Sequence, residues 1–358
     1  MEGSPIDIVV FAPLAPLLGV LLFWFIQLLF IESQKYFLNK ISHKHPAFCR
    51  FTNFLGILFQ TICHALGYTV TKSGISEFYI SVNYGRVAPK KEKKGIFEWV
   101  SNAFLFVGPF FIPAFLTVVI LYFFIPDGFS IVTPDQLINL KYTFGGQLTI
   151  FGISLFNFAN SFFYFLTNLD LLHPAQLGFL FLLIFLGLGI RPSHIGEEKP
   201  HKVDMIYELR NIWNLISHKP LYLIILGALV YLIFYISLYL NTSIYVAIFV
   251  ILGWVSIISI ISLFVSHLII FFIRIVDEIP RFWKYVPIIV LLSSYIIARA
   301  LFFYFSMHDY VYSTSLFIML FSTFIVTFLL YRTKSDKFKT IREMKLLKKK
   351  TQGDADER

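Results

Sequence analysis

The sequence predicts an all-α protein that crosses a membrane several times. Three observations point to this class: 57% of the residues are apolar, only 14% are charged, and the mean hydropathy is +0.74. A soluble domain carries about 45–50% apolar and about 25% charged residues. The 43 Phe, 19 Tyr and 5 Trp side chains also exceed what a water-soluble core of this length can hide. The composition therefore excludes a disordered chain, a collagen-like chain and a disulfide-rich domain.

Long apolar runs predict about nine membrane helices, because a hydrocarbon core of about 30 Å takes about 20 apolar residues per helix. The runs cover residues 8–30, 51–70, 97–124, 147–166, 171–190, 221–240, 244–273, 286–305 and 313–331. The first run is too long for the apolar region of a signal sequence, so we expect a retained helix that is kinked at Pro13 and Pro16.

Two shorter patterns predict elements outside these helices. Residues 75–84 alternate apolar and polar side chains after the break at Ser73-Gly74, which predicts a strand or a β-hairpin near residues 74–87. Residues 203–216 repeat apolar side chains at helical spacing, which predicts an amphipathic helix at the membrane surface. The chain thus divides into a membrane bundle (1–190), an amphipathic cytoplasmic connector (191–220), a second membrane bundle (221–331) and a basic tail (332–358).

The positions of Lys and Arg predict the orientation and the partners. The tail holds ten basic and five acidic residues, so we expect a protein of the cell membrane whose C-terminus lies in the cytoplasm. Six basic residues between 72 and 94 would then lie outside, so either one apolar run is re-entrant or the count is off by one. The net charge of +9 is spread over loops beside apolar runs, which indicates contact with anionic lipid headgroups and no nucleic-acid partner. We expect Cys49 and Cys63 to be free thiols.

His64 lies on the second predicted helix, the strand-like segment follows it, and residues 102–109 read NAFLFVGP. This order resembles the site-2 protease family of intramembrane zinc metalloproteases. In that family a membrane helix with the motif H-E-x-x-H is followed by a β-hairpin at the membrane edge, and then by a helix with small residues and Gly-Pro. The family's third zinc ligand is an Asp in a later helix, and Asp170 in Asn168-Leu169-Asp170 is the nearest match. The resemblance covers about a third of the chain.

The motif departs from the family at the residues that carry the chemistry. The five positions read His64-Ala65-Leu66-Gly67-Tyr68, so the general base is Ala and the second histidine is Tyr. The resemblance therefore implies a protein that does not hydrolyse peptides. It also implies a remnant zinc site formed by His64, Asp170 and His173. The alternatives are a His64 bonded to a neighbouring helix and an Asp170 that contacts a helix end or a headgroup.

Several polar residues lie at membrane depth, where they are costly and need partners. They are Asn157, Asn160, His267 and Arg299. Asn157 and Asn160 share one helix face, and we expect them and His267 to form hydrogen bonds between helices. Arg299 should pair with a carboxylate or extend toward the interface, and a polar pathway for a substrate is the alternative for all four.

Three functions remain open from the sequence. The first is a degenerate site-2-protease-like protein that binds a transmembrane segment of another protein, or a lipid, without cleaving it. The second is a transporter or a membrane enzyme of another class that uses Arg299, Asp170 and the two asparagines. The third is an assembly factor that works through its basic loops. The sequence has no phosphate-binding loop, no nucleophile elbow and no cysteine pair spaced for a metal.

Overall fold

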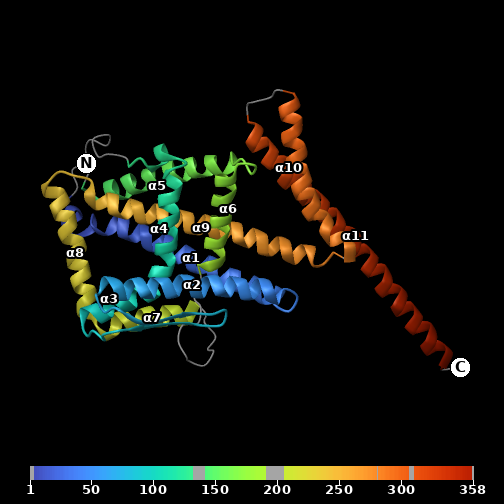
Figure 1. Cartoon of the computed structure of the whole chain (residues 1–358), viewed down its shortest axis with the longest axis horizontal. Helices are drawn as coiled ribbons and strands as arrows, with labels where there is room; N and C mark the ends of the chain where they lie inside the picture. The colour runs from blue at the N-terminus through green and yellow to red at the C-terminus, as the bar shows by residue number, and fades with distance from the viewer. Residues whose placement is uncertain (1–3, 132–141, 191–204, 280, 306–309, 357–358) are drawn as a thin grey trace. The chain divides into compact units, whose positions relative to one another are not determined.

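A computed structural model describes residues 4–131, 142–190, 205–279, 281–305 and 310–356, and it is almost entirely helical (Figure 1). The chain forms two compact units, which are described separately below. The first contains Met1–Phe165 and Pro174–Leu268, and the second contains Leu166–His173 and Ile269–Arg358. Each unit is a set of elements that contact one another. The predicted division into two membrane bundles, a connector and a tail describes how the chain crosses the membrane, and it stays a prediction.

The elements follow one another along the chain in this order: η1 (Asp7–Phe11), α1 (Leu14–Ile41), α2 (Pro46–Val70), β1 (Ile75–Ile80), β2 (Gly85–Pro89), α3 (Ile96–Phe106), α4 (Gly108–Tyr122), η2 (Pro126–Phe129), α5 (Phe144–Thr167), α6 (Pro174–Gly189), α7 (Met205–His218), α8 (Pro220–Tyr239), α9 (Ile244–Val276), η4 (Arg281–Tyr285), α10 (Val286–Tyr304) and α11 (Val311–Asp356). The predicted kink near Pro13 separates η1 from α1, and the predicted amphipathic helix is α7. Cys49 and Cys63 are free thiols.

The predicted class of an all-α membrane protein with one small hairpin is confirmed. Within the described residues, six helices are long and apolar enough to cross a membrane, and the pair α3–α4 is a seventh if it forms one broken span. The pair bends by 68° near Pro109, which lacks a backbone N–H and is the second residue of α4. The nine predicted segments are all helical, but α6 has only 16 residues and α2 carries polar side chains along its length.

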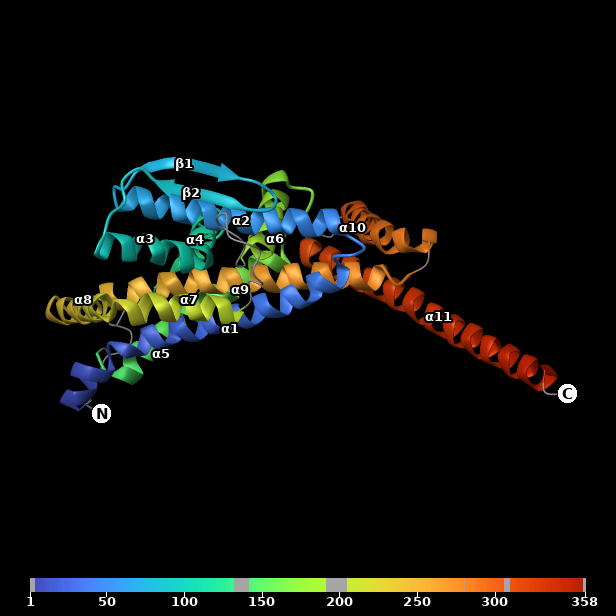
Figure 2. The ribbon, with the colours of Figure 1, turned by 90° about the horizontal axis from the view of Figure 1, so that it is seen from below.

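Helices α1 and α9 carry a set of buried polar side chains, called here the polar seam. Its members are all fully buried: Gln27 and Gln34 on α1, and Ser256, Ser259, Ser262 and Ser266 on α9. The Tyr245 hydroxyl on α9 donates to the Pro13 carbonyl, and Gln34 Nε2 on α1 donates to Ser266 Oγ at 2.8 Å. Both pairs are 232 residues apart in sequence, so α1 and α9 run parallel with one register, side by side in Figures 1 and 2.

Helix α6 crosses this seam at Gly187. The Gly187 carbonyl accepts a second hydrogen bond from Gln34 Nε2 at 3.0 Å. A Cβ atom at Gly187 would lie 2.0 Å from the Ser262 carbonyl oxygen. Only glycine therefore allows α6 and α9 to touch backbone to backbone at this point.

The predicted hairpin is present and lies along α2. Strands β1 and β2 are antiparallel, with Phe78 opposite Val87 and Tyr79 opposite Arg86. Strand β2 faces α2, because a Cβ atom at Gly85 would lie 2.2 Å from Thr61 Oγ1. Strand β1 is the outer strand in Figure 2, and its residues are mostly exposed.

In the second unit, α10 packs against α11. The short segment Leu166–His173, which lies between α5 and α6 in the sequence, belongs to this unit. Its backbone is held on α10, where the Leu171 N–H donates to the Tyr295 hydroxyl at 2.9 Å. This arrangement brings Asp170 beside the polar residues of α10.

Candidate functional site

The charged residues Asp170 and Arg299 form an ion pair inside the second unit. Arg299 Nη2 lies 3.3 Å from Asp170 Oδ2, and each side chain is 19% exposed. Asp170 Oδ1 also accepts from the Leu172 N–H at 3.0 Å and from the Tyr295 hydroxyl at 3.4 Å. Asp170 is thus the carboxylate that Arg299 needs at membrane depth, and its charge is shared among three donors.

Two tyrosines complete this cluster. Tyr295 precedes Arg299 by four residues on α10, so both project from the same helix face. Tyr312, at the start of α11, lies under the guanidinium with its ring centre 4.4 Å from Arg299 Cζ. Neither tyrosine is among the residues predicted from the sequence, although the four-residue spacing of Tyr295 from Arg299 is a visible signal. No sequence pattern marked Tyr312.

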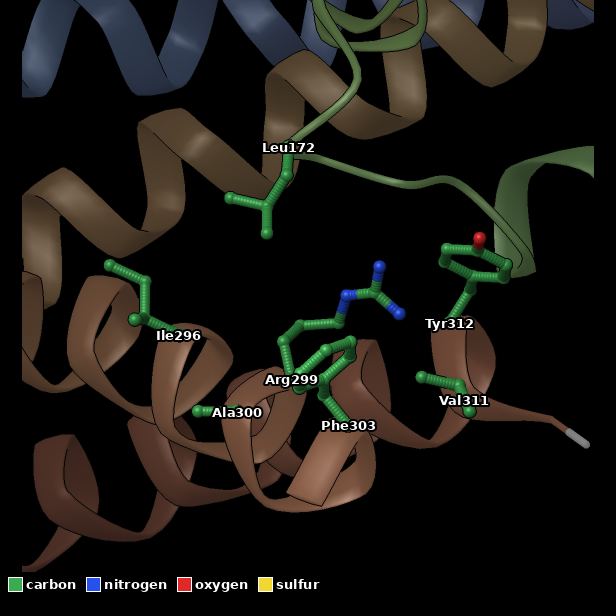
Figure 3. A pocket seen from close by; sticks show the side chains of 7 residues that line it. All are labelled: Leu172, Ile296, Arg299, Ala300, Phe303, Val311 and Tyr312. Atoms are coloured by element: carbon green, nitrogen blue, oxygen red, sulfur yellow. The ribbon is translucent and has the colours of Figure 1, made fainter. Parts of the chain in front are cut away.

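A cavity of about 500 Å³ opens beside the ion pair (Figure 3). Its walls are mainly apolar and consist of Leu172, Ile296, Arg299, Ala300, Phe303, Val311 and Tyr312. The Arg299 side chain extends between Leu172 and Tyr312 in Figure 3. Its Nε–H is buried and has no hydrogen-bond partner in the described part of the chain. The site therefore offers an unused donor at the edge of an apolar cavity.

His64 lies in the first unit, on the buried side of α2, and is 8% exposed. The Tyr68 ring lies over its imidazole with ring centres 4.5 Å apart. Neither ring nitrogen has a hydrogen-bond partner among the described residues. The described residues therefore show no hydrogen bond from His64 to a neighbouring helix, which was the alternative to a metal ligand. Tyr68 covers the face where a second imidazole of the motif would lie.

His173 lies in the same turn as Asp170, since its backbone N–H donates to the Asp170 carbonyl at 3.0 Å. The His173 side chain is exposed. Among the described residues, no group of three His, Cys, Asp or Glu side chains is placed to hold a metal ion. His64 belongs to one unit, while Asp170 and His173 belong to the other, so the remnant zinc site stays a prediction.

The other predicted polar residues lie elsewhere. Asn157 and Asn160 are exposed on α5, and Asn160 lines a separate cavity of about 470 Å³ with Asp127 and Tyr164. His267 Nδ1 lies 2.9 Å from the Leu263 carbonyl, so this histidine bonds within its own helix. The His267 ring also packs edge-to-face against two phenylalanine rings. Its centre lies 5.6 Å from that of Phe30 and 6.1 Å from that of Phe37.

A comparison with protein-family models found none that matches the chain, and comparisons with curated proteins and with solved structures found no match either.

Proposed function

We propose that this multi-pass membrane protein is a catalytically inactive relative of the site-2 protease family, and that it binds an extended part of another membrane protein without cleaving it. The observation that carries the proposal is the outer edge of strand β1, which pairs with no strand other than β2 in the described part of the chain and lies in the hairpin along the helix that bears His64. The proposal places the protein in the cell membrane with a cytoplasmic C-terminus, on the strength of the basic tail.

The absence of hydrolysis rests on the residues at the motif. Metal-assisted hydrolysis needs a base that takes a proton from the metal-bound water, and the methyl group of Ala65 takes none. The phenol of Tyr68 replaces an imidazole ligand and lies 4.5 Å from the His64 ring, centre to centre. His64 alone supplies one ligand, which is too few for a catalytic zinc site with three protein ligands.

Binding of an extended segment rests on the edge of β1. The Ser81 N–H donates to the Tyr84 carbonyl at 3.0 Å, which makes Ser81 and Tyr84 a hydrogen-bonded pair at the end of the hairpin. Bonded and non-bonded pairs alternate along an antiparallel ladder, so the backbone groups of Phe78 point away from β2. A partner strand that pairs there would gain main-chain hydrogen bonds, as in other cases of strand addition.

The side chains around this edge suit a partner at the membrane surface. Phe78 and Tyr79 are 50% and 47% exposed, which is much apolar surface for an outer strand. Lys93 Nζ lies 4.8 Å from the centre of the Phe97 ring, and further lysines flank the strand in sequence. Aromatic rings and basic groups together favour the headgroup region, where a membrane segment of a partner emerges.

Site-specific photocrosslinking in intact membranes tests this proposal. A photoreactive amino acid at Phe78 should give a discrete crosslinked partner, and one at Phe123, which is 80% exposed at the end of α4, should not. In a crosslinking variant with the probe at Tyr79, Phe78→Pro should abolish the product because it removes the outward N–H, while Phe78→Ala should keep it.

Two results would contradict the proposal. One is equal crosslinking from Phe78 and Phe123, which would mean that β1 has no specific partner. The other is chelator-sensitive cleavage of a membrane-embedded peptide by the purified protein, which would mean that the motif is active despite Ala65.

A further inference from the structure

The guanidinium of Arg299 has unused hydrogen-bonding capacity. An arginine carries five N–H donors in a planar fork. Nη2 serves Asp170 at 3.3 Å, the Tyr312 ring covers one face, and the Nε–H is buried with no partner among the described residues. A buried donor without an acceptor is costly, so an acceptor is expected at this edge.

The Asp170 carboxylate accepts from Nη2 of Arg299, so it leaves the Nε–H without an acceptor. The carboxylate is held by the Leu172 N–H and the Tyr295 hydroxyl as well as by Arg299, so its position is fixed on one side of the guanidinium. The fork of an arginine binds phosphate and carboxylate groups with two parallel hydrogen bonds. An anion could therefore bind the free edge of Arg299 while the ion pair remains intact.

The rest of the cavity is suited to a hydrocarbon chain. Ile296, Ala300 and Phe303 on α10 and Leu172 opposite them form apolar walls around about 500 Å³ (Figure 3). Ile296 and Phe303 are both exposed, so the cavity opens toward the surroundings of α10. Pockets of this volume hold a headgroup or the upper part of a chain, but not a whole lipid.

The depth of the cavity also fits a lipid. Arg299 lies five residues before Tyr304, the last residue of α10. At the rise of an α-helix this separation is about 7.5 Å along the axis, or roughly one and a half turns. Tyr304, Phe305 and Tyr310 at this end are strongly exposed, as expected for an aromatic belt at the interface. The guanidinium therefore lies just below the belt, where lipid phosphates and glycerol groups meet the chains.

We infer that this cavity binds one anionic phospholipid, with its phosphate on the Nε edge of Arg299 and an acyl chain along Ile296, Ala300 and Phe303. A fatty acid would present a carboxylate with the same hydrogen-bonding chemistry. The phospholipid is favoured because it is a resident of the bilayer at this depth, and the experiment below separates the two.

Native mass spectrometry of the full-length protein in detergent tests the inference. The probes are dioleoyl phosphatidylglycerol, dioleoyl phosphatidylcholine and palmitate, each added alone and in competition. The wild-type protein should retain one phosphatidylglycerol at least tenfold more strongly than either other probe.

Three variants assign the binding to the cavity. Ala300→Phe fills the cavity and leaves the ion pair, and it should weaken retention at least tenfold. The double variant Arg299→Gln with Asp170→Asn removes both charges and should do the same. Lys284→Gln is the matched control, because Lys284 is an exposed cation 5.0 Å from the Tyr285 ring near the other end of α10, and retention should not change.

The inference is overturned if phosphatidylglycerol and phosphatidylcholine are retained equally, or if palmitate is retained more strongly than phosphatidylglycerol. It is also overturned if Ala300→Phe and the double variant both bind like the wild type. A gel-filtration profile shows whether each variant is folded, and Ala300→Leu replaces Ala300→Phe if the larger side chain prevents folding.

Discussion

Replacement of Gly187 by Ala should loosen the contact between α6 and α9. The new Cβ atom would lie 2.0 Å from the Ser262 carbonyl oxygen, 2.4 Å from its carbon and 2.9 Å from Ser266 Oγ. Cβ atoms in folded proteins essentially never come closer than 3.0 Å to such atoms. Because backbone atoms in a close-packed interior cannot rotate away as a side chain can, the two helices must separate by about 1 Å at this crossing.

The cost of that separation has two parts. A gap of about 0.5–1 Å forfeits a quarter to a half of the dispersion energy of the atoms on its walls, and overpacked cores lose about 1–3 kcal/mol. The hydrogen bond from Gln34 Nε2 to the Gly187 carbonyl is stretched as well. Such bonds in membranes contribute about 0.6–1.7 kcal/mol. We therefore expect the free energy of unfolding to fall by about 2–4 kcal/mol.

Unfolding of the purified protein in mixed micelles by increasing SDS, followed by tryptophan fluorescence, measures this loss. Gly178→Ala is the matched control, because it lies in the same helix and its Cβ would meet nothing within 4 Å. That variant should be unchanged or more stable by up to about 1 kcal/mol. If Gly187→Ala is as stable as Gly178→Ala, the close approach of α6 and α9 is refuted.

Three further predictions concern other contacts of the two units. Arg299→Leu removes the cation beside Asp170 and should lower the free energy of unfolding by about 3–5 kcal/mol in the same assay. Leu at both positions should lower it less. A variant that stays stable but no longer carries a solute across the membrane would favour a transporter instead. Tyr245→Phe removes the hydrogen bond to α1 and should cost about 0.6–1.7 kcal/mol, whereas Tyr239→Phe at a strongly exposed site should not. Gly85→Ala should lift the hairpin from α2 and speed hydrogen exchange in both strands, because its Cβ would lie 2.2 Å from a threonine hydroxyl.

Two of these measurements have a matched control variant. Lys284→Leu removes an exposed cation and should not alter stability by more than about 0.5 kcal/mol. Gly145→Ala, whose Cβ would meet nothing within 4 Å, should leave hairpin exchange as in the wild type. Unaltered exchange in the Gly85 variant would show that β2 is not seated on α2.

Local patterns were enough to predict the elements near the motif. The alternation after Ser73 predicted the hairpin because a strand's period of two is written in consecutive residues. Gly74 adopts the positive φ of 68° that the break before the hairpin requires. The spacing of apolar residues in 203–216 predicted α7 for the same reason. The number of membrane crossings could not be predicted in this way. The predicted segments at α2 and α6 are helical, but they differ from the other membrane helices in polarity and in length.

Contacts between distant segments could not be predicted in the same way. The sequence indicates that Arg299 needs a carboxylate, and it marks Asp170 only as a metal ligand or a helix-end contact. The two residues are 129 apart and nothing local pairs them. In the sequence the serines of α9 look like ordinary small residues, and nothing local indicates that Ser266 bonds to Gln34 on α1 or Ser259 to the Phe110 carbonyl on α4. Proximity of this kind depends on how helices pack, and single-residue patterns carry no information about it.

The parallel pairing of α1 with α9 sets an order for biogenesis. The serine that bonds to Gln34 lies 232 residues further along the chain. At a synthesis rate of about 5–20 residues per second, that serine leaves the ribosome roughly 10–50 s after the glutamine. Throughout that interval the Gln34 amide of the newly inserted helix lacks the serine to which it bonds. A translocon or membrane chaperone that shelters α1 until α9 arrives would prevent its premature association with foreign helices.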